Sequence, residues 1–95
     1  MTKAKQVEVI KGRIDFEKEF LDEQIKRRNK ARKEFEKCTP KEYKEKKSNF
    51  DTCYTAVSKQ HMYISGVLDA ARILGLISND EYGELCKQVF DGVFS

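Results

Sequence analysis

Two long stretches with few helix-breaking residues, one on each side of Pro40, repeat mostly apolar side chains every seven residues. The first repeat is Val7, Ile14, Leu21, Arg28 and Phe35, interleaved by Ile10, Glu17, Gln24 and Ala31. The second is Tyr43, Phe50, Val57, Ile64 and Ala71, interleaved by Lys47, Tyr54, His61, Leu68 and Gly75. Such a repeat is typical of helices that pair as a coiled coil. The sequence therefore predicts an all-α fold with two long helices.

Capping patterns set the helix boundaries. Thr39-Pro40-Lys41-Glu42 offers a capping hydroxyl, a proline at the first helical position and an acidic residue at the third, and Ser78-Asn79-Asp80-Glu81 has the same hydroxyl-to-acid spacing. Gly75 is a helix stop. We expect helices over about 5–37, 40–74 and 79–93. Ninety-five residues are too few for two cores, so residues 1–95 should form a single helical domain.

A tight reversal at Cys38-Thr39 places residues whose numbers sum to about 78 opposite each other in an antiparallel, coiled-coil-like hairpin. Apolar residues then meet, and the predicted pairs are Ile14 with Ile64, Leu21 with Val57, and Phe35 with Tyr43. Toward the turn the pairs become polar, so the far half of the hairpin should be the less stable half. The third helix is too short to cover more than the base, where we expect it to pack on Val67, Ala70, Ile73 and Leu74.

The same register pairs Glu17 with His61. We interpret this pair as a polar layer that fixes the helix pairing. The functional alternative is a pH-sensitive pair or a general base, since His61 is the only histidine.

Apolar residues remain outside the repeat on the first helix, namely Val9, Phe16 and Phe20. Two coverings are open. The third helix could fold back and bring Phe90 and Phe94 to their level. A second copy could instead cover them, since thin domains of this size often complete a core by dimerising, and Phe16, Phe20 and Tyr63 would then form the homodimer face.

Charge divides the molecule along its length. Residues 26–47 hold eleven basic and four acidic residues, a net charge of +7, whereas the remainder holds eight basic and twelve acidic, a net charge of −4. We call residues 26–47 the basic arm. Its predicted partner-binding residues are Lys26, Arg27, Arg28, Lys30, Arg32, Lys33, Lys44, Lys46 and Lys47. The plainer interpretation is that these charges only keep a long exposed helix pair soluble.

Several function classes lack support in the sequence. Cys38, Cys53 and Cys86 form no CxxC pair and only one histidine accompanies them, so we predict no metal site and no cofactor. No stretch is apolar enough for a signal peptide or a membrane span, so we expect no membrane partner and a cytoplasmic location.

One enzyme family shares part of a pattern. Lys11, Ile14-Asp15 and Arg28 on the first helix, with Gln88 on the third, resemble the all-helical chorismate mutases. The resemblance implies a helical enzyme that holds a dicarboxylate between converging cations. The chain has lysine at position 11 where the family has arginine, and no arginine lies near Asp51 on the second helix. Without that cation set the reaction lacks its electrostatic catalyst, so this is a remote alternative.

We therefore predict a protein that is not an enzyme but an interaction module, a small regulator or inhibitor, which docks an acidic partner surface through the basic arm. The main alternative is nucleic-acid binding by the same arm, although the net charge of +3 is modest for that role.

Overall fold

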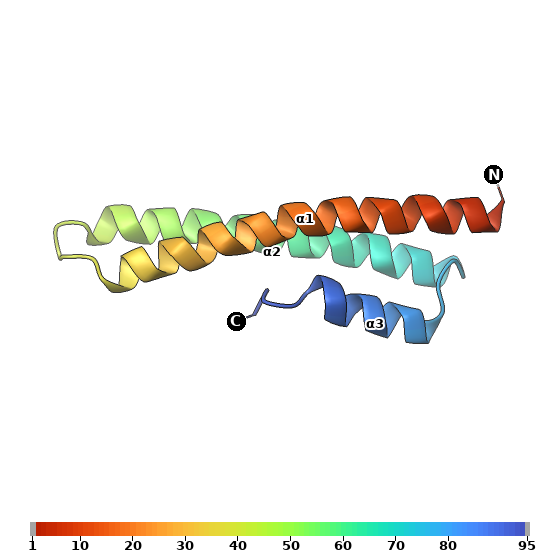
Figure 1. Ribbon diagram of the computed structural model, residues 1–95. Helices are drawn as coiled ribbons and strands as arrows, with labels where there is room; N and C mark the ends of the chain where they lie inside the picture. The colour runs from red at the N-terminus through yellow and green to blue at the C-terminus, as the bar shows by residue number, and fades with distance from the viewer. Residues whose placement is uncertain (1, 95) are drawn as a thin grey trace.

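The computed structural model describes residues 2–94. These residues form three helices and no strand. The helices are α1 (Lys3–Glu36), α2 (Tyr43–Ile73) and α3 (Asn79–Val89). Helices α1 and α2 form a long antiparallel hairpin, and the short α3 lies beside the end opposite the turn (Figure 1). The molecule is 58 Å long and only 22 Å by 16 Å across. The predicted fold class is confirmed.

The turn of the hairpin differs from the prediction, because α2 begins at Tyr43 and not at Pro40. The backbone N–H and the hydroxyl of Thr39 both donate to Glu42 Oε1, at 3.2 and 2.9 Å. The Thr39 side chain thus donates to Glu42 and does not cap the helix, so residues 40–42 form a turn before the first helical residue. These two hydrogen bonds hold the pKa of Glu42 below its ordinary value.

The end of α2 and the start of α3 lie within one residue of the predicted positions, and local hydrogen bonds define both. Helix α2 ends in a Schellman motif, with Leu76 N–H bonded to the Ala71 carbonyl at 2.9 Å and Gly75 N–H to the Arg72 carbonyl at 3.0 Å. Gly75 has a φ of +72°, which glycine adopts without strain. The Ser78 capping box predicted for α3 is complete.

Helix α3 is four residues shorter than expected. It ends at Val89, and Phe90 to Phe94 form a turn in which Val93 N–H bonds to the Phe90 carbonyl at 3.1 Å. Gly92 has a φ of +82°, which an α-helix does not accommodate.

The core occupies the base of the hairpin. Ile14, Leu21, Val57 and Ile64 are each at most 2% exposed and belong to one hydrophobic cluster, as the predicted pairing requires. Helix α3 and the turn after it add Val89 and Val93 to this cluster. Between residues 32 and 56 no side chain is buried, so the far half of the hairpin has no sealed core.

The predicted Glu17–His61 pair is wrong by one residue. Gln60 Nε2 donates to Glu17 Oε2 at 2.6 Å and to the Glu17 carbonyl at 3.1 Å. His61 instead packs edge-on against the rings of Phe90 and Phe94, with centroids 4.4 and 5.3 Å away. Gln60 and His61 lie on different sides of the contact between α1 and α2, and the chain after α3 covers the side that carries His61. Glu17 is still part of a polar layer, with Gln60 of α2 and Arg13 of α1 as its partners.

Helix α3 is fixed to the hairpin by polar contacts as well. Tyr82 O–H donates to Asp69 Oδ1 at 2.6 Å, and the Arg72 guanidinium lies 4.9 Å from the centre of the Tyr82 ring. Glu81 pairs with Lys11 of α1 at 3.6 Å. The hydrogen bond to Asp69 is the main reason that the pKa of Tyr82 is raised to about 12.

Candidate functional site

The basic arm presents a group of cations that are free of intramolecular ion pairs. Among residues 2–94, the predicted binding residues that are exposed and form no ion pair are Lys26, Arg27, Lys30, Lys33 and Lys44. The first four lie on α1 and the last on α2, beside the turn that joins the helices (Figure 1). Lys26, Lys30 and Lys33 are spaced by four and three residues, and Arg27 is three residues before Lys30, which keeps the four on one side of α1. We call these five residues the free cations.

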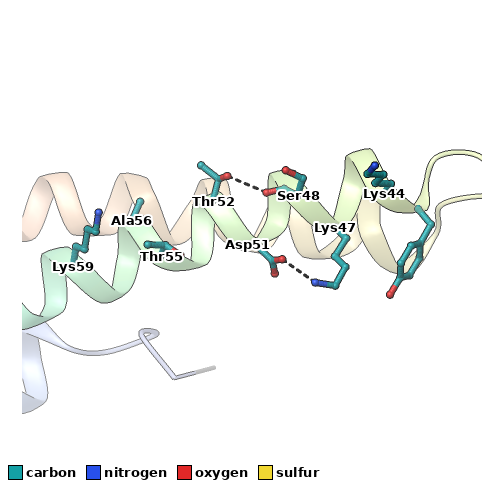
Figure 2. Close-up of a pocket in the computed structure, with 9 residues that line it drawn as sticks. Lys44, Lys47, Ser48, Asp51, Thr52, Thr55, Ala56 and Lys59 are labelled. Atoms are coloured by element: carbon teal, nitrogen blue, oxygen red, sulfur yellow. Dashed lines mark hydrogen bonds and ion pairs between the residues drawn. The ribbon is translucent and has the colours of Figure 1, made fainter.

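Two further lysines of the arm are already paired. Lys47 Nζ lies 2.9 Å from Asp51 Oδ2, one turn further along α2 (Figure 2), and this hydrogen bond raises the pKa of Lys47. Lys46 Nζ lies 3.9 Å from Glu34 Oε2 across the hairpin. Pairs on a solvated surface contribute only about 0–1 kcal/mol each, so a partner's carboxylates or phosphates can replace them at little cost.

Arg28 does not belong to the binding surface, which corrects the sequence prediction. It is 1% exposed, and its guanidinium donates to the carbonyls of Val93 and Gly92, the latter at 2.9 Å. It also donates to the Asn29 side chain at 3.0 Å. Burial lowers the pKa of Arg28 below its ordinary value, but an arginine stays charged in a protein. Arg28 therefore holds the chain that follows α3 against the hairpin.

Aromatic rings fill the space between the helices of the arm. Phe35 contacts Tyr43 with ring centroids 5.4 Å apart and Phe50 with centroids 6.1 Å apart, and Phe50 contacts Tyr54 at 6.1 Å. The guanidinium of the half-buried Arg32 lies 5.9 Å from the centre of the Phe50 ring. The predicted Phe35–Tyr43 pair is confirmed. These contacts hold the two helices together where the sealed core ends.

A shallow depression, which the sequence pattern did not indicate, follows α2 from Tyr43 to Lys59. Lys44, Ser48, Thr52 and Thr55 line it among others, and the Thr52 hydroxyl donates to the Ser48 carbonyl at 3.0 Å (Figure 2). The side chains that line it are hydroxyls, lysines, one carboxylate, the Tyr43 ring and the methyl group of Ala56, all carried by a single helix. Such a surface suits exchangeable polar contacts with a partner and offers no enclosed site for chemistry.

The predicted dimer face is exposed. Phe16 is 63% exposed, Phe20 51% and Tyr63 46%. Arg13 connects the two helices on this side, because it donates to the Tyr63 hydroxyl at 3.3 Å and lies 5.8 Å from the centre of the Phe16 ring. It also pairs with Glu17 of its own helix at 3.0 Å, so an ion pair with a second copy would be shared with or exchanged for this one. We call this side of the hairpin the open face.

Helix α3 does not cover the open face. It contacts α2 through Asp69 and Arg72, and Phe90 and Phe94 after it contact His61. Of the two coverings that the sequence left open, the one in which Phe90 and Phe94 cover Phe16 and Phe20 is therefore not observed.

The residues behind the chorismate mutase resemblance are engaged in structural contacts or lie apart. Lys11 pairs with Glu81, and Arg28 donates to backbone carbonyls. These two residues are 17 positions apart on α1, or about 26 Å along the helix. They cannot hold one small substrate in this arrangement.

Within residues 2–94, no three histidine, cysteine or carboxylate side chains gather where they could hold a metal ion. No helix in the same range is long and apolar enough to cross a membrane. Cys38, Cys53 and Cys86 are all unpaired and half-buried.

The fold and the charge distribution describe a class of protein: a helical hairpin with a short third helix on its base and a cationic far end. No protein-family model matches the chain, and neither the curated proteins nor the solved structures contain a significant match. Function is therefore inferred from the chain's own residues.

Proposed function

We propose that the protein is a non-enzymatic interaction module, a small regulator or inhibitor, that docks an acidic protein surface through the basic arm. The observation that supports this most is the set of free cations, which have no carboxylate partner within residues 2–94. A net charge of +7 at one end of a narrow molecule, with −4 over the rest, orients an acidic partner toward the arm. The acidic remainder repels the same partner.

The shape of the arm supports docking by a preformed surface. The contacts of Phe35 with Tyr43 and Phe50 join α1 to α2 near the turn, which reduces the reordering that the nearby cations need on binding. Arg27 can form a bidentate pair with a carboxylate, and Lys26, Lys30 and Lys33 add point charges around it. Charges of this kind mainly raise the association rate and select the partner.

The alternative ligand is nucleic acid, bound by the same arm. Phosphates would meet the same lysines and arginine, and binding would depend steeply on salt. One observation favours the protein partner: the net charge of the whole chain is only +3, which is modest for a nucleic-acid-binding protein.

The protein would act in the cytoplasm. Cys38, Cys53 and Cys86 are unpaired thiols, the usual state of cysteine in a reducing compartment.

A capture experiment with and without nuclease tests the proposal. The arm variant carries Arg27→Glu, Lys30→Glu and Lys33→Glu. The matched control carries Lys3→Glu, Lys5→Glu and Lys87→Glu, which change the net charge equally on exposed residues outside the arm. We expect a protein partner that survives nuclease, binds the wild type and the control, and is lost with the arm variant. Loss of all captured material on nuclease treatment would instead favour nucleic acid, and equal capture by both variants would exclude the arm.

A further inference from the structure

The open face of α1 carries a second heptad pattern, separate from the one that pairs α1 with α2. Its residues are spaced alternately by four and three and are all exposed: Val9, Arg13, Phe16, Phe20, Glu23 and Arg27. Phe16 and Phe20 are 63% and 51% exposed, which is unusual for phenylalanine. A continuous stripe of this spacing on a helix is the geometry of a helix-pairing surface.

The stripe is complementary to itself when it is read in the opposite direction. In an antiparallel pair of α1 helices related by a twofold axis midway between Phe16 and Phe20, residues whose numbers sum to 36 face each other. Phe16 then faces Phe20 of the second copy, and Arg13 faces Glu23, each contact occurring twice. Val9 faces the aliphatic part of Arg27. Opposite charges thus flank a centre of four phenylalanine rings.

Helix α2 fits the same axis. Gln60 is bonded to Glu17, so it lies level with the proposed centre on α1. Along the open face of α2 the small residues Cys53 and Ala56 precede Gln60, and the larger Tyr63 and Val67 follow it. An antiparallel second copy therefore sets large side chains of one molecule against small ones of the other, which is the condition for close packing.

We propose that the open face binds a second copy of this chain, and that the protein is an antiparallel homodimer centred on Phe16 and Phe20 with reciprocal Arg13–Glu23 ion pairs. The self-complementarity is the reason to prefer a second copy over an unrelated partner, because an isologous interface requires that one surface match its own reverse. The dimer would point the two basic arms in opposite directions, with the turn ends of the two α1 helices about 55 Å apart.

Charge exchange tests the register as well as the association. Sedimentation equilibrium over about 1 to 300 µM should give a dimer for the wild type. Arg13→Glu sets two glutamates against each other at both ends of the interface, and Glu23→Arg does the same with arginines. Each variant alone should raise the dissociation constant about tenfold or more. An equimolar mixture of the two should restore association, because a mixed dimer regains both opposite-charge pairs.

Matched controls separate this interface from general effects on charge or hydrophobicity. Glu19→Arg reverses a charge that is exposed on α1 outside the stripe, and Met62→Ser removes a 70% exposed apolar side chain from α2 outside the open face. Both should leave the dimer intact, whereas Phe16→Ser with Phe20→Ser should give a folded monomer with unchanged helix content.

A monomeric wild type over the whole concentration range would overturn the proposal. A dimer that the mixture of charge variants fails to restore, or that persists without Phe16 and Phe20, would overturn the register and the face.

Discussion

Removing the donors of Arg28 should release the chain segment that follows α3. The proposed change is Arg28→Met, which keeps a long apolar side chain in the hairpin and leaves the carbonyls of Gly92 and Val93 without their donor. A hydrogen bond from a charged donor contributes about 1.5–3 kcal/mol, so two of them are worth about 3–6 kcal/mol. The methionine no longer has to be desolvated as a charge, and the released carbonyls can bind water, which offsets part of the loss. We expect a net decrease of about 2–3 kcal/mol in the free energy of unfolding.

Urea unfolding followed by circular dichroism measures this change, and hydrogen exchange of residues 90–94 shows where it occurs. The matched control is Arg27→Met, which removes the neighbouring but exposed cation and should change stability by less than about 0.5 kcal/mol. In the Arg28→Met background, deleting the chain from Gly92 onward should cost less than the same deletion in the wild type, because the two groups act as one unit. Unchanged stability together with unchanged exchange in residues 90–94 would refute the assigned role.

Three further predictions concern the base of the molecule. Ile64→Ala, at a site only 1% exposed, should lower the free energy of unfolding by about 2–4 kcal/mol in a denaturant titration, and a change near zero would contradict its place in the core. Ser78→Ala removes half of a capping box and should cost about 1 kcal/mol. The Ser78 backbone N–H, which alanine would keep, is the main reason that the pKa of Glu81 is lowered in the folded state, so the contribution of the Glu81 carboxylate is present above pH 4.5 and is lost as pH falls through the lower folded value. Glu81→Gln should therefore show less loss of stability in acid than the wild type. The pKa of Tyr82 is raised to about 12 from 10.0, so its stabilising contribution is complete below pH 10 and is lost as pH rises toward 12. Tyr82→Phe should remove that alkaline loss in thermal melts recorded between these pH values, and an unchanged pH profile would contradict the hydrogen bond to Asp69.

The architecture could be predicted because it depends on periodicity and on one turn. The heptad repeats in both long helices determine which sides meet, and the turn near Thr39 determines the register, so the burial of Ile14 and Ile64 in one cluster follows from position alone. The start of α2 was missed by three residues because the Thr39 hydroxyl can either accept from the Glu42 N–H, as a helix cap does, or donate to the Glu42 carboxylate, as it does here, and the sequence pattern is the same for both.

The polar contacts of the base could not be predicted, because they depend on where α3 and the segment after it lie. Arg28 was placed among the partner-binding cations on account of its charge, although its position in the apolar repeat already indicated an inward side chain. The repeat does not identify the groups that accept hydrogen bonds from Arg28, because the carbonyls of Gly92 and Val93 come from a turn that is distant in the sequence. Gln60 and His61 were exchanged for the same reason: the rings that cover His61 belong to that turn.

The exposure of the free cations could be anticipated only in part. Composition places eleven basic residues in the arm, but the partners of Lys46 and Lys47 depend on side-chain geometry at the surface. The open face could be anticipated more fully. The spacing of Phe16 and Phe20 places them outside the contact between α1 and α2, and both residues are exposed in the structure.

Fluorescence anisotropy with two labelled probes, a polyglutamate peptide and a short DNA duplex, tests most directly whether ligands dock on the basic arm. Three proteins are titrated at low and at moderate salt. They are the wild type, the arm variant with charge reversals at Arg27, Lys30 and Lys33, and the matched control with reversals at Lys3, Lys5 and Lys87. We expect binding of anionic probes by wild type and control that weakens with salt, little binding by the arm variant, and a preference for the peptide over the duplex at equal ionic strength. Equal binding by the arm variant and the control, or binding insensitive to salt, would contradict the assignment of the arm as the docking site.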